Sequence, residues 1–201
     1  MTTATNESTK FDAIVCAARD QIAESGIVGL RVQEVARRAE CSVSLIYRHF
    51  TSRNGLIAHV LTEDYSRNID RWREVVYEVE HGTGPVDVER IIDSLPLPSS
   101  DYTRKVRWTR VQALAASVDN TILRDRLAFL AREFQALSER LINCVARRNA
   151  VTITFDVPAF TQLTMSFAFM LIHNEFMDSS EQLDDERMRA MYRDLIGRYL
   201  S

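Results

Sequence analysis

The sequence of 201 residues is poor in residues that break helices or cross-link a chain, with six glycines, four prolines and three cysteines. Cys16, Cys41 and Cys144 lie far apart and lack the CxxC spacing of zinc and redox sites. We therefore expect reduced thiols in a cytoplasmic protein that holds no cofactor and no metal.

Long apolar runs are also absent, and the longest, which ends at His173, is far shorter than the ~20 residues of a membrane span. The first ten residues contain no apolar stretch of the kind found in secretory signals, so we expect a short disordered arm over residues 1–9. Catalytic patterns are missing too, because the four histidines are scattered and no glycine-rich phosphate loop or nucleophile–base pair occurs. The sequence predicts neither a membrane segment nor catalytic residues.

What the chain does have is apolar residues at three- and four-residue spacing along nearly its whole length. This periodicity predicts an all-α fold of about nine helices, with Gly26 as the stop of the first one. A β-prone stretch within residues 149–156 has no partner strand and is expected to be a loop. The helices are expected at residues 9–24, 32–39, 43–49, 53 to beyond 72, 86–94, 101–117, 120–148, 158–177 and 184–199.

The segment 31–53 stands out by charge, since it holds five arginines and two acidic residues in a chain whose net charge is −3. It reads as two short helices joined by a tight turn. Ala36 and Ala39 are small enough for close packing, and Ile46 and Phe50 have the spacing of buried anchors. Such a pair of helices with a cationic outer face can place the second helix in the major groove of DNA.

The side chains left to face DNA are arginines, hydroxyl-bearing residues and aliphatic residues, which suit guanine edges, phosphates and thymine methyl groups. Ser42 is also the expected N-cap of the second helix. The next helix begins at Ser52 and Arg53 and offers free backbone N–H groups beside a cation, as a phosphate site requires. For Tyr47 packing alone remains an alternative, and for Arg37 and Arg38 a solvated face remains equally open. The predicted DNA-binding residues are Arg31, Arg37, Ser42, Val43, Ser44, Leu45, Tyr47, Arg48, His49 and Arg53.

Residues 10–60 resemble the N-terminal DNA-binding domain of the tetracycline-repressor (TetR) family, with the spacing kept through three helices. The residues that carry the resemblance are Ile14, Ala17, Ala18, Gly26, Gly29, Val35, Ala36, Ala39, Ser42, Tyr47, Phe50, Ser52 and Leu56. The resemblance implies an all-α homodimer whose last two long helices form the dimer interface. It also implies a small-molecule pocket among the central helices, whose occupation changes the separation of the two DNA-reading heads.

The chain departs from the family pattern at several positions. Arg31 replaces the usual Thr or Ser before the second helix and cannot cap that helix in the same way. Glu40 replaces a usual Gly in the turn, where a left-handed conformation would carry a cost. Residues 43–45 replace the usual Lys, Gly and Thr, which weakens cationic reading of the operator, whereas Arg53 in place of Lys keeps the charge.

We assign the DNA-binding domain to residues 10–54. Residues 55–201 are expected to form an effector-binding and dimerisation domain that regulates it. Central aromatic residues are candidates for the effector pocket, although residues at helical spacing also suit a core; they are Trp72, Tyr77, Tyr102, Trp108, Phe129 and Phe134. The helix at 158–177 is apolar almost all round, so a partner subunit is an economical cover for it, with burial inside one subunit as the alternative. The predicted interface residues are Phe160, Phe167, Phe169, Met170, Met188, Met191 and Leu195.

These patterns together predict a dimeric, nucleoid-associated transcriptional regulator. We expect a repressor that binds double-stranded DNA at a palindromic operator and is released by a small-molecule effector. The alternatives are a helical DNA-binding architectural or interaction protein without an effector, which a filled core would favour, and an all-α enzyme. The sequence leaves the effector and the operator open.

Overall fold

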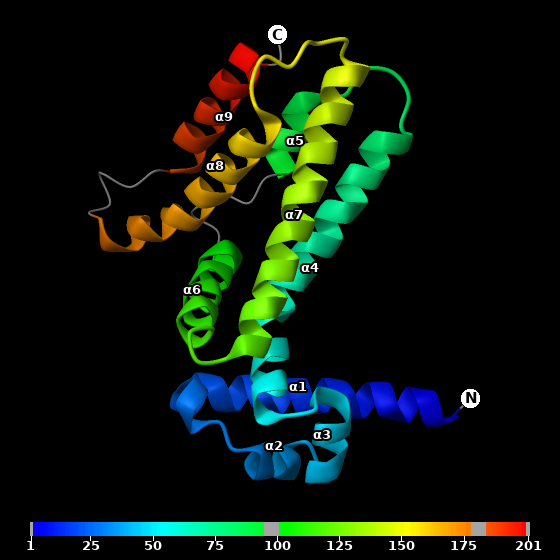
Figure 1. Ribbon diagram of the computed structural model, residues 1–201, viewed down its shortest axis with the longest axis vertical. Helices are drawn as coiled ribbons and strands as arrows, with labels where there is room; N and C mark the ends of the chain where they lie inside the picture. Colours follow the sequence, from blue (N-terminus) through cyan, green and yellow to red (C-terminus); the bar gives the residue numbers. More distant parts are fainter. Residues whose placement is uncertain (1, 95–100, 178–183, 200–201) are drawn as a thin grey trace. The chain divides into compact units, whose positions relative to one another are not determined.

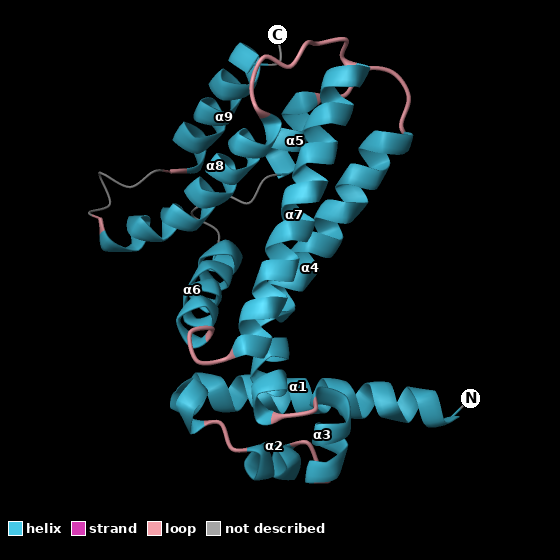
Figure 2. Cartoon of the chain, viewed as in Figure 1, coloured by secondary structure: helices cyan, strands magenta, loops and turns pink. Residues whose placement is uncertain are grey.

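The computed structural model describes residues 2–94, 101–177 and 184–199, and within these ranges all regular structure is helical (Figures 1 and 2). The all-α prediction is therefore confirmed, since no strand occurs in the described part of the chain. The elements are α1 (Thr2–Gly29), α2 (Val32–Arg38), α3 (Val43–Phe50), α4 (Arg53–His81), α5 (Val88–Ser94), α6 (Asp101–Ala116), α7 (Thr121–Arg148), α8 (Val157–Met170), the 3-10 helix η1 (Leu171–Phe176) and α9 (Asp185–Tyr199).

Side-chain caps fix where several helices begin. Ser42 Oγ accepts a hydrogen bond from the backbone N–H of Leu45 at 3.2 Å, which confirms it as the N-cap of α3. Ser52 Oγ accepts from the N–H of Gly55 at 3.0 Å at the start of α4. The loop at residues 149–156 is free of strand structure, as predicted.

The start of the chain corrects one prediction. The disordered arm expected over residues 1–9 is wrong for the described backbone, because α1 begins at Thr2. Once the helix is nucleated further along, each added residue brings one more backbone hydrogen bond, so even weak helix formers extend it. The predicted stop at Gly26 is present as a kink with φ 72°, after which the helix resumes as far as Gly29. Glycine reaches that conformation without the steric penalty of a Cβ atom.

The helices form two compact units, each of which has its own core. The first unit contains the chain up to Asp64 together with Arg110–Phe129, and so comprises α1 to α3 with the first turns of α4, the end of α6 and the start of α7. Asn120 Nδ2 donates to the carbonyl of Asn54 at 3.2 Å and ties the start of α7 to α4. Arg126 Nε donates to Thr62 Oγ1 at 2.8 Å and makes a second link between the same helices.

The second unit contains Tyr65–Thr109 and the chain from Leu130 onward. Within it, Arg148 closes the C-terminal end of α4 by donating to the carbonyls of Val79 at 2.6 Å, Thr83 at 2.7 Å and Gly84 at 2.7 Å. Arg193 on α9 pairs with Glu89 on α5 at 2.8 Å. None of the helices in the described ranges has the length and apolar character needed to cross a membrane.

Candidate nucleic-acid interface

Helices α2 and α3 form the candidate reading head, which a small apolar core holds against α1. Val35 and Ile46 are completely buried, and Ala36 and Phe50 are nearly so. Small residues on α2 let α3 approach closely, and the two large residues of α3 anchor a helix of eight residues that would be unstable alone. The anchoring roles predicted for Ile46 and Phe50 are confirmed.

The turn between α2 and α3 carries the backbone strain that the Gly-to-Glu departure predicted. Glu40 adopts φ 49°, a left-handed conformation that is costly for a residue with a Cβ atom. The N–H of Cys41 donates to the carbonyl of Ala36 at 3.0 Å and closes the turn. Lys10 Nζ on α1 donates to the carbonyls of Ala39 at 3.4 Å and Glu40 at 3.1 Å. A cation at the C-terminal end of α2 stabilises the helix dipole and the turn together.

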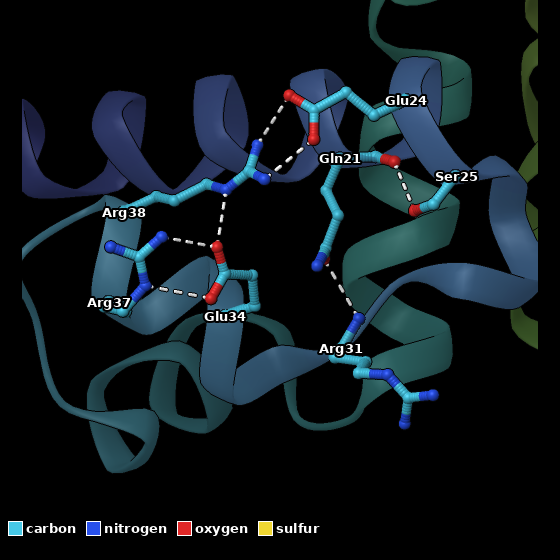
Figure 3. A network of polar contacts seen from close by, with 7 residues as sticks. All are labelled: Gln21, Glu24, Ser25, Arg31, Glu34, Arg37 and Arg38. Carbon is cyan, nitrogen blue, oxygen red and sulfur yellow. Dashed lines mark hydrogen bonds and ion pairs between the residues drawn. The ribbon is translucent and has the colours of Figure 1, made fainter.

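The start of α2 is capped by a residue from another helix. Arg31 has an extended backbone and its own side chain makes no cap, as expected from its replacement of Thr or Ser. Its backbone N–H donates instead to Gln21 Oε1 on α1 at 2.9 Å (Figure 3). A signal for this role lies in the sequence, because Gln21 follows Ile14 by seven residues on the buried stripe of α1, where a polar residue needs a partner.

A network of ion pairs covers the outer face where α1 meets α2 (Figure 3). Arg38 donates to both carboxylate oxygens of Glu24, at 2.8 Å and 2.7 Å, and to Glu34 at 2.9 Å. Arg37 also donates to both carboxylate oxygens of Glu34, at 2.9 Å and 2.6 Å. Hydrogen bonds from Arg37 and then Arg38 lower the pKa of Glu34 to about 2, and the bond from Arg38 lowers the pKa of Glu24. Both arginines are therefore paired with carboxylates.

The exposed side of α3 gathers three of the predicted contact residues. Ser44, Tyr47 and Arg48 are exposed, with Tyr47 at 43% of its possible surface. Their spacing of three and four residues puts them on one face of the helix, opposite the buried anchors. Ser42 is exposed at the start of the helix, and Val43 and Leu45 are half-buried at the edges of this face. We call Ser44, Tyr47 and Arg48 the reading face.

His49 does not belong to the reading face, and its assignment to DNA is corrected. Its ring packs edge-on against Phe11 of α1 with centroids 5.5 Å apart, and its Nε2 atom is buried without a hydrogen-bond partner among the described residues. The physical reason is that His49 follows Ile46 by three residues and so shares the inward side of α3.

Arg53 also has a different role from the predicted phosphate contact. Its Nε donates to the carbonyl of Leu30 at 2.9 Å, and one terminal nitrogen donates to the carbonyls of Ile27 at 2.7 Å and Val28 at 3.1 Å. These oxygens belong to the end of α1 and the chain that follows it, where helical partners run out. Arg53 therefore fastens the end of α1 to the start of α4.

Several of the aromatic residues predicted for an effector pocket have ring partners of their own in the structure. Trp72 pairs with Phe134 at 6.0 Å between ring centroids. Tyr77 stacks on the ring of His81, and Trp108 packs edge-on against Phe176. Phe129 belongs to the first unit and is exposed, while the side chain of Tyr102 lies outside those that the structure describes. Aromatics at helical spacing on long helices point in several directions, and the sequence alone does not show which way each helix is rotated.

A cavity of about 750 Å³ lies instead in the first unit, beside the reading head. Its walls come from the end of α1, the starts of α2 and α4, the end of α6, the turn before α7 and one residue of α3. The lining residues are Ile27, Val28, Leu30, Arg31, Val32, Gln33, Tyr47, Arg53, Asn54, Ile57, Gln112, Ala115, Ala116, Asp119 and Asn120. None of the six aromatics predicted for the pocket is among them.

The residues predicted for a dimer interface have different environments. Met188 is only 1% exposed, so its assignment to a subunit interface is corrected: α9 packs on α5 and buries this side chain inside one chain. Phe160, Met191 and Leu195 are half-buried, and the side chains of Phe167, Phe169 and Met170 lie outside those described. Leu163 on α8 is 67% exposed and Phe176 at the end of η1 is 72% exposed.

The geometry defines a class of protein: a helical protein with a helix-turn-helix domain whose second helix is anchored inward and polar outward. Among the described residues, no group of three or more His, Cys, Asp or Glu side chains could hold a metal ion. Residues 14–60 match the model of the bacterial regulatory proteins of the tetR family. No curated protein has a significant match to the sequence.

Solved structures with the same fold extend the comparison over almost the whole chain. A TetR-family transcriptional regulator from Rhodococcus sp. is 23% identical, with 96% of this chain and 100% of that chain covered and a TM-score of 0.66. A transcriptional regulator from Saccharomonospora viridis in complex with choline is 17% identical, with 97% of each chain covered and a TM-score of 0.65. The transcriptional regulator FadR from Bacillus subtilis in complex with stearoyl-CoA is 15% identical, with 95% and 98% covered and a TM-score of 0.59.

The match over residues 14–60 includes α2 and α3 of the reading head, and almost the whole chain has the fold of solved TetR-family transcriptional regulators.

Proposed function

We propose that this protein is a homodimeric repressor that binds a palindromic operator through the reading face of α3 and leaves it when a small molecule binds. The observation that carries the proposal is the reading face, where Ser44, Tyr47 and Arg48 are exposed on a helix anchored by Ile46 and Phe50. In helix-turn-helix proteins the second helix enters the major groove, and the two heads of a dimer lie ~34–36 Å apart.

The chemistry of the reading face suits a mixture of base and phosphate contacts. Arg48 can bind guanine or phosphate, and the hydroxyl groups of Ser44 and Tyr47 can donate to phosphate oxygens. Val43 and Leu45 stand at the edges of this face and can contact thymine methyl groups. Arg31 is exposed beside α2 and adds a cation near the DNA backbone. Because these cations lie in a chain whose net charge is −3, we expect this face to orient the protein on the nucleoid.

Dimerisation is proposed from exposed apolar surface on α8 and η1. Leu163 and Phe176 expose most of their apolar surface in the single chain, and association with a second copy would remove that surface from water. An isologous contact of this kind would present two reading heads to a two-fold symmetric operator. An effector could then shift the dimer between conformations only by binding one of them more tightly.

The decisive experiment selects binding sites from random double-stranded DNA with the purified full chain. We expect a palindromic consensus. The affinity of the protein for this DNA should fall steeply with salt, because cations that bind phosphates release the counterions of DNA. Tyr47→Ala should weaken binding by roughly 1–3 kcal/mol, or about 5- to 150-fold. Tyr77→Ala is the matched control, since Tyr77 is also an exposed tyrosine but lies in α4 outside the reading head.

Two outcomes would contradict the proposal. A selection without any consensus, or an affinity that does not depend on salt, would rule out specific operator binding. Equal affinities for Tyr47→Ala, Tyr77→Ala and the wild type would remove Tyr47 from the contact surface. Sedimentation of each variant shows whether a loss of affinity arises from DNA contact or from loss of the dimer.

A further inference from the structure

The cavity beside the reading head is bordered by two groups that we assign to DNA contact. Tyr47 from the reading face lines it, and Arg31 lines it from the start of α2. Both residues belong to the same compact unit as the remaining walls, so the cavity is a feature of the first unit itself. Its volume of about 750 Å³ falls within the ~300–1,000 Å³ typical of small-molecule sites.

Much of the cavity wall is fixed by hydrogen bonds within the protein. Arg53 donates to three carbonyls between residues 27 and 30 and holds the end of α1 in place. Asn120 is buried, donates to the carbonyl of Asn54 at 3.2 Å and accepts from the N–H of Leu123 at 3.1 Å. A wall whose polar groups already have partners keeps its shape without a ligand, which lowers the entropic cost of binding.

The charges that remain in the cavity select one class of ligand. The Arg31 side chain has no hydrogen-bond or ion-pair partner among the described residues, and its guanidinium points away from the Glu34 network (Figure 3). Asp119 supplies one carboxylate, and the two lining arginines outnumber it. Leu30 and Ile57 are almost completely buried and provide an apolar floor. An apolar body with one negative group matches this combination of surfaces.

We propose that this cavity binds an amphipathic monocarboxylate, with the carboxylate on Arg31 and the apolar body on the floor, and that this ligand competes with DNA. Competition follows because Tyr47 and Arg31 would contact both the ligand and the operator. When one of these partners is bound, the two side chains are less available to bind the other. Binding of the ligand to the cavity does not depend on the proposed function, whereas the competition rests on the proposed operator binding. By thermodynamic linkage, each species must weaken the other by the same factor.

The first test measures binding to the full chain by calorimetry without DNA. Decanoate is the probe, decanol is its uncharged match and decyltrimethylammonium is its cationic match. We expect decanoate to bind at least tenfold more tightly than either match. Absence of decanoate binding would overturn the cavity site, and tighter binding of the cation would overturn the assigned ligand class, because Asp119 would then dominate.

Variants locate the site. Ala115→Trp adds bulk at an exposed wall position and should abolish decanoate binding, whereas Ala136→Trp changes an exposed alanine of α7 outside the cavity and should bind like the wild type. Arg31→Gln should remove the preference for decanoate over decanol, and the exposed Arg132, also outside the cavity, provides the control Arg132→Gln. Circular dichroism shows that each variant is folded. Equal decanoate affinities within either pair of variants would place the probe elsewhere and overturn the site.

The second test repeats the operator titration with increasing decanoate. We expect the apparent Kd for the operator to rise in the wild type and in Ala136→Trp, and the decanoate affinity to fall by the same factor when operator is present. Unchanged operator affinity with saturated decanoate would overturn the competition and leave the cavity site standing. If no DNA sequence binds at all, the proposed function and the competition fail together, while the calorimetry still decides the cavity site.

Discussion

Replacement of Ile46 by alanine tests the orientation of α3 directly, because neighbouring residues of this helix have opposite environments. Ile46 is completely buried, so truncation removes three carbon atoms from the core and not from the surface. At about 0.8 kcal/mol for each buried methylene, the lost transfer free energy is roughly 2.4 kcal/mol. The cavity left behind adds to this loss, and Ile→Ala changes in protein cores cost about 2–5 kcal/mol in total.

The matched control is Tyr47→Ala at the next position. Tyr47 is 43% exposed and contributes to no core cluster, so we expect its truncation to change the free energy of unfolding by less than about 0.5–1 kcal/mol. Urea unfolding followed by circular dichroism measures the total stability, and hydrogen exchange over residues 43–50 reports on α3 itself. Ile46→Ala should therefore accelerate exchange in α3, whereas Tyr47→Ala should reduce operator affinity with nearly normal exchange.

The reasoning is refuted if the two variants behave alike. A loss of less than about 1 kcal/mol for Ile46→Ala would mean that this side chain is not enclosed as the structure shows. A comparable loss of stability for Tyr47→Ala would mean that the Tyr47 ring stabilises the fold and is not available to contact DNA. Either result would assign the reading face to another side of α3.

Three further predictions concern other parts of the chain. Gly55→Ala should destabilise the protein by about 1–3 kcal/mol in urea, despite alanine's higher helix propensity, because its Cβ would lie 2.0 Å from the carbonyl oxygen of Phe50; unchanged stability would contradict this close approach. Burial, reinforced by nearby Arg126, lowers the pKa of His59 below its usual 6.5. The unfolded chain therefore binds more protons than the folded one, and the free energy of unfolding should fall as the pH drops below about 6.5. His59→Gln should make this dependence of stability on pH weaker, and an unchanged dependence would refute the prediction. Leu163→Arg should shift sedimentation from dimer to monomer, whereas the same change at exposed Leu114 on α6 should not; a stable dimer would remove α8 from the interface.

Local sequence patterns were sufficient for the helices and for the inner side of the reading head. The spacing of Ile46 and Phe50 identifies the buried side of α3, and Ser42 marks where that helix begins. The same spacing argument applied to His49 would have placed it on the buried side as well, since it follows Ile46 by three residues. This error came from treating every polar residue of the segment as a candidate contact.

Contacts between distant residues could not be predicted in this way. The hydrogen bonds of Arg53 reach back more than twenty residues to the end of α1, and those of Lys10 reach forward about thirty residues to the turn. Met188 was misassigned for a related reason: an apolar stripe shows that a helix needs a partner but not whether the partner is α5 of the same chain or a second subunit. The cavity is likewise assembled from segments that no local pattern connects.

The carboxylate of Glu34 has a consequence that extends beyond holding α1 and α2 together. Because Arg37 and Arg38 both donate to it, Glu34 keeps a charged partner when either arginine turns away. Arg37 is the more exposed of the two, and an exposed ion pair of this kind contributes little to stability. Arg37 can therefore leave Glu34 and bind a DNA phosphate, because Glu34 would still be paired with Arg38. Before it meets DNA, the Arg37 guanidinium is thus held in an ion pair that costs little to break.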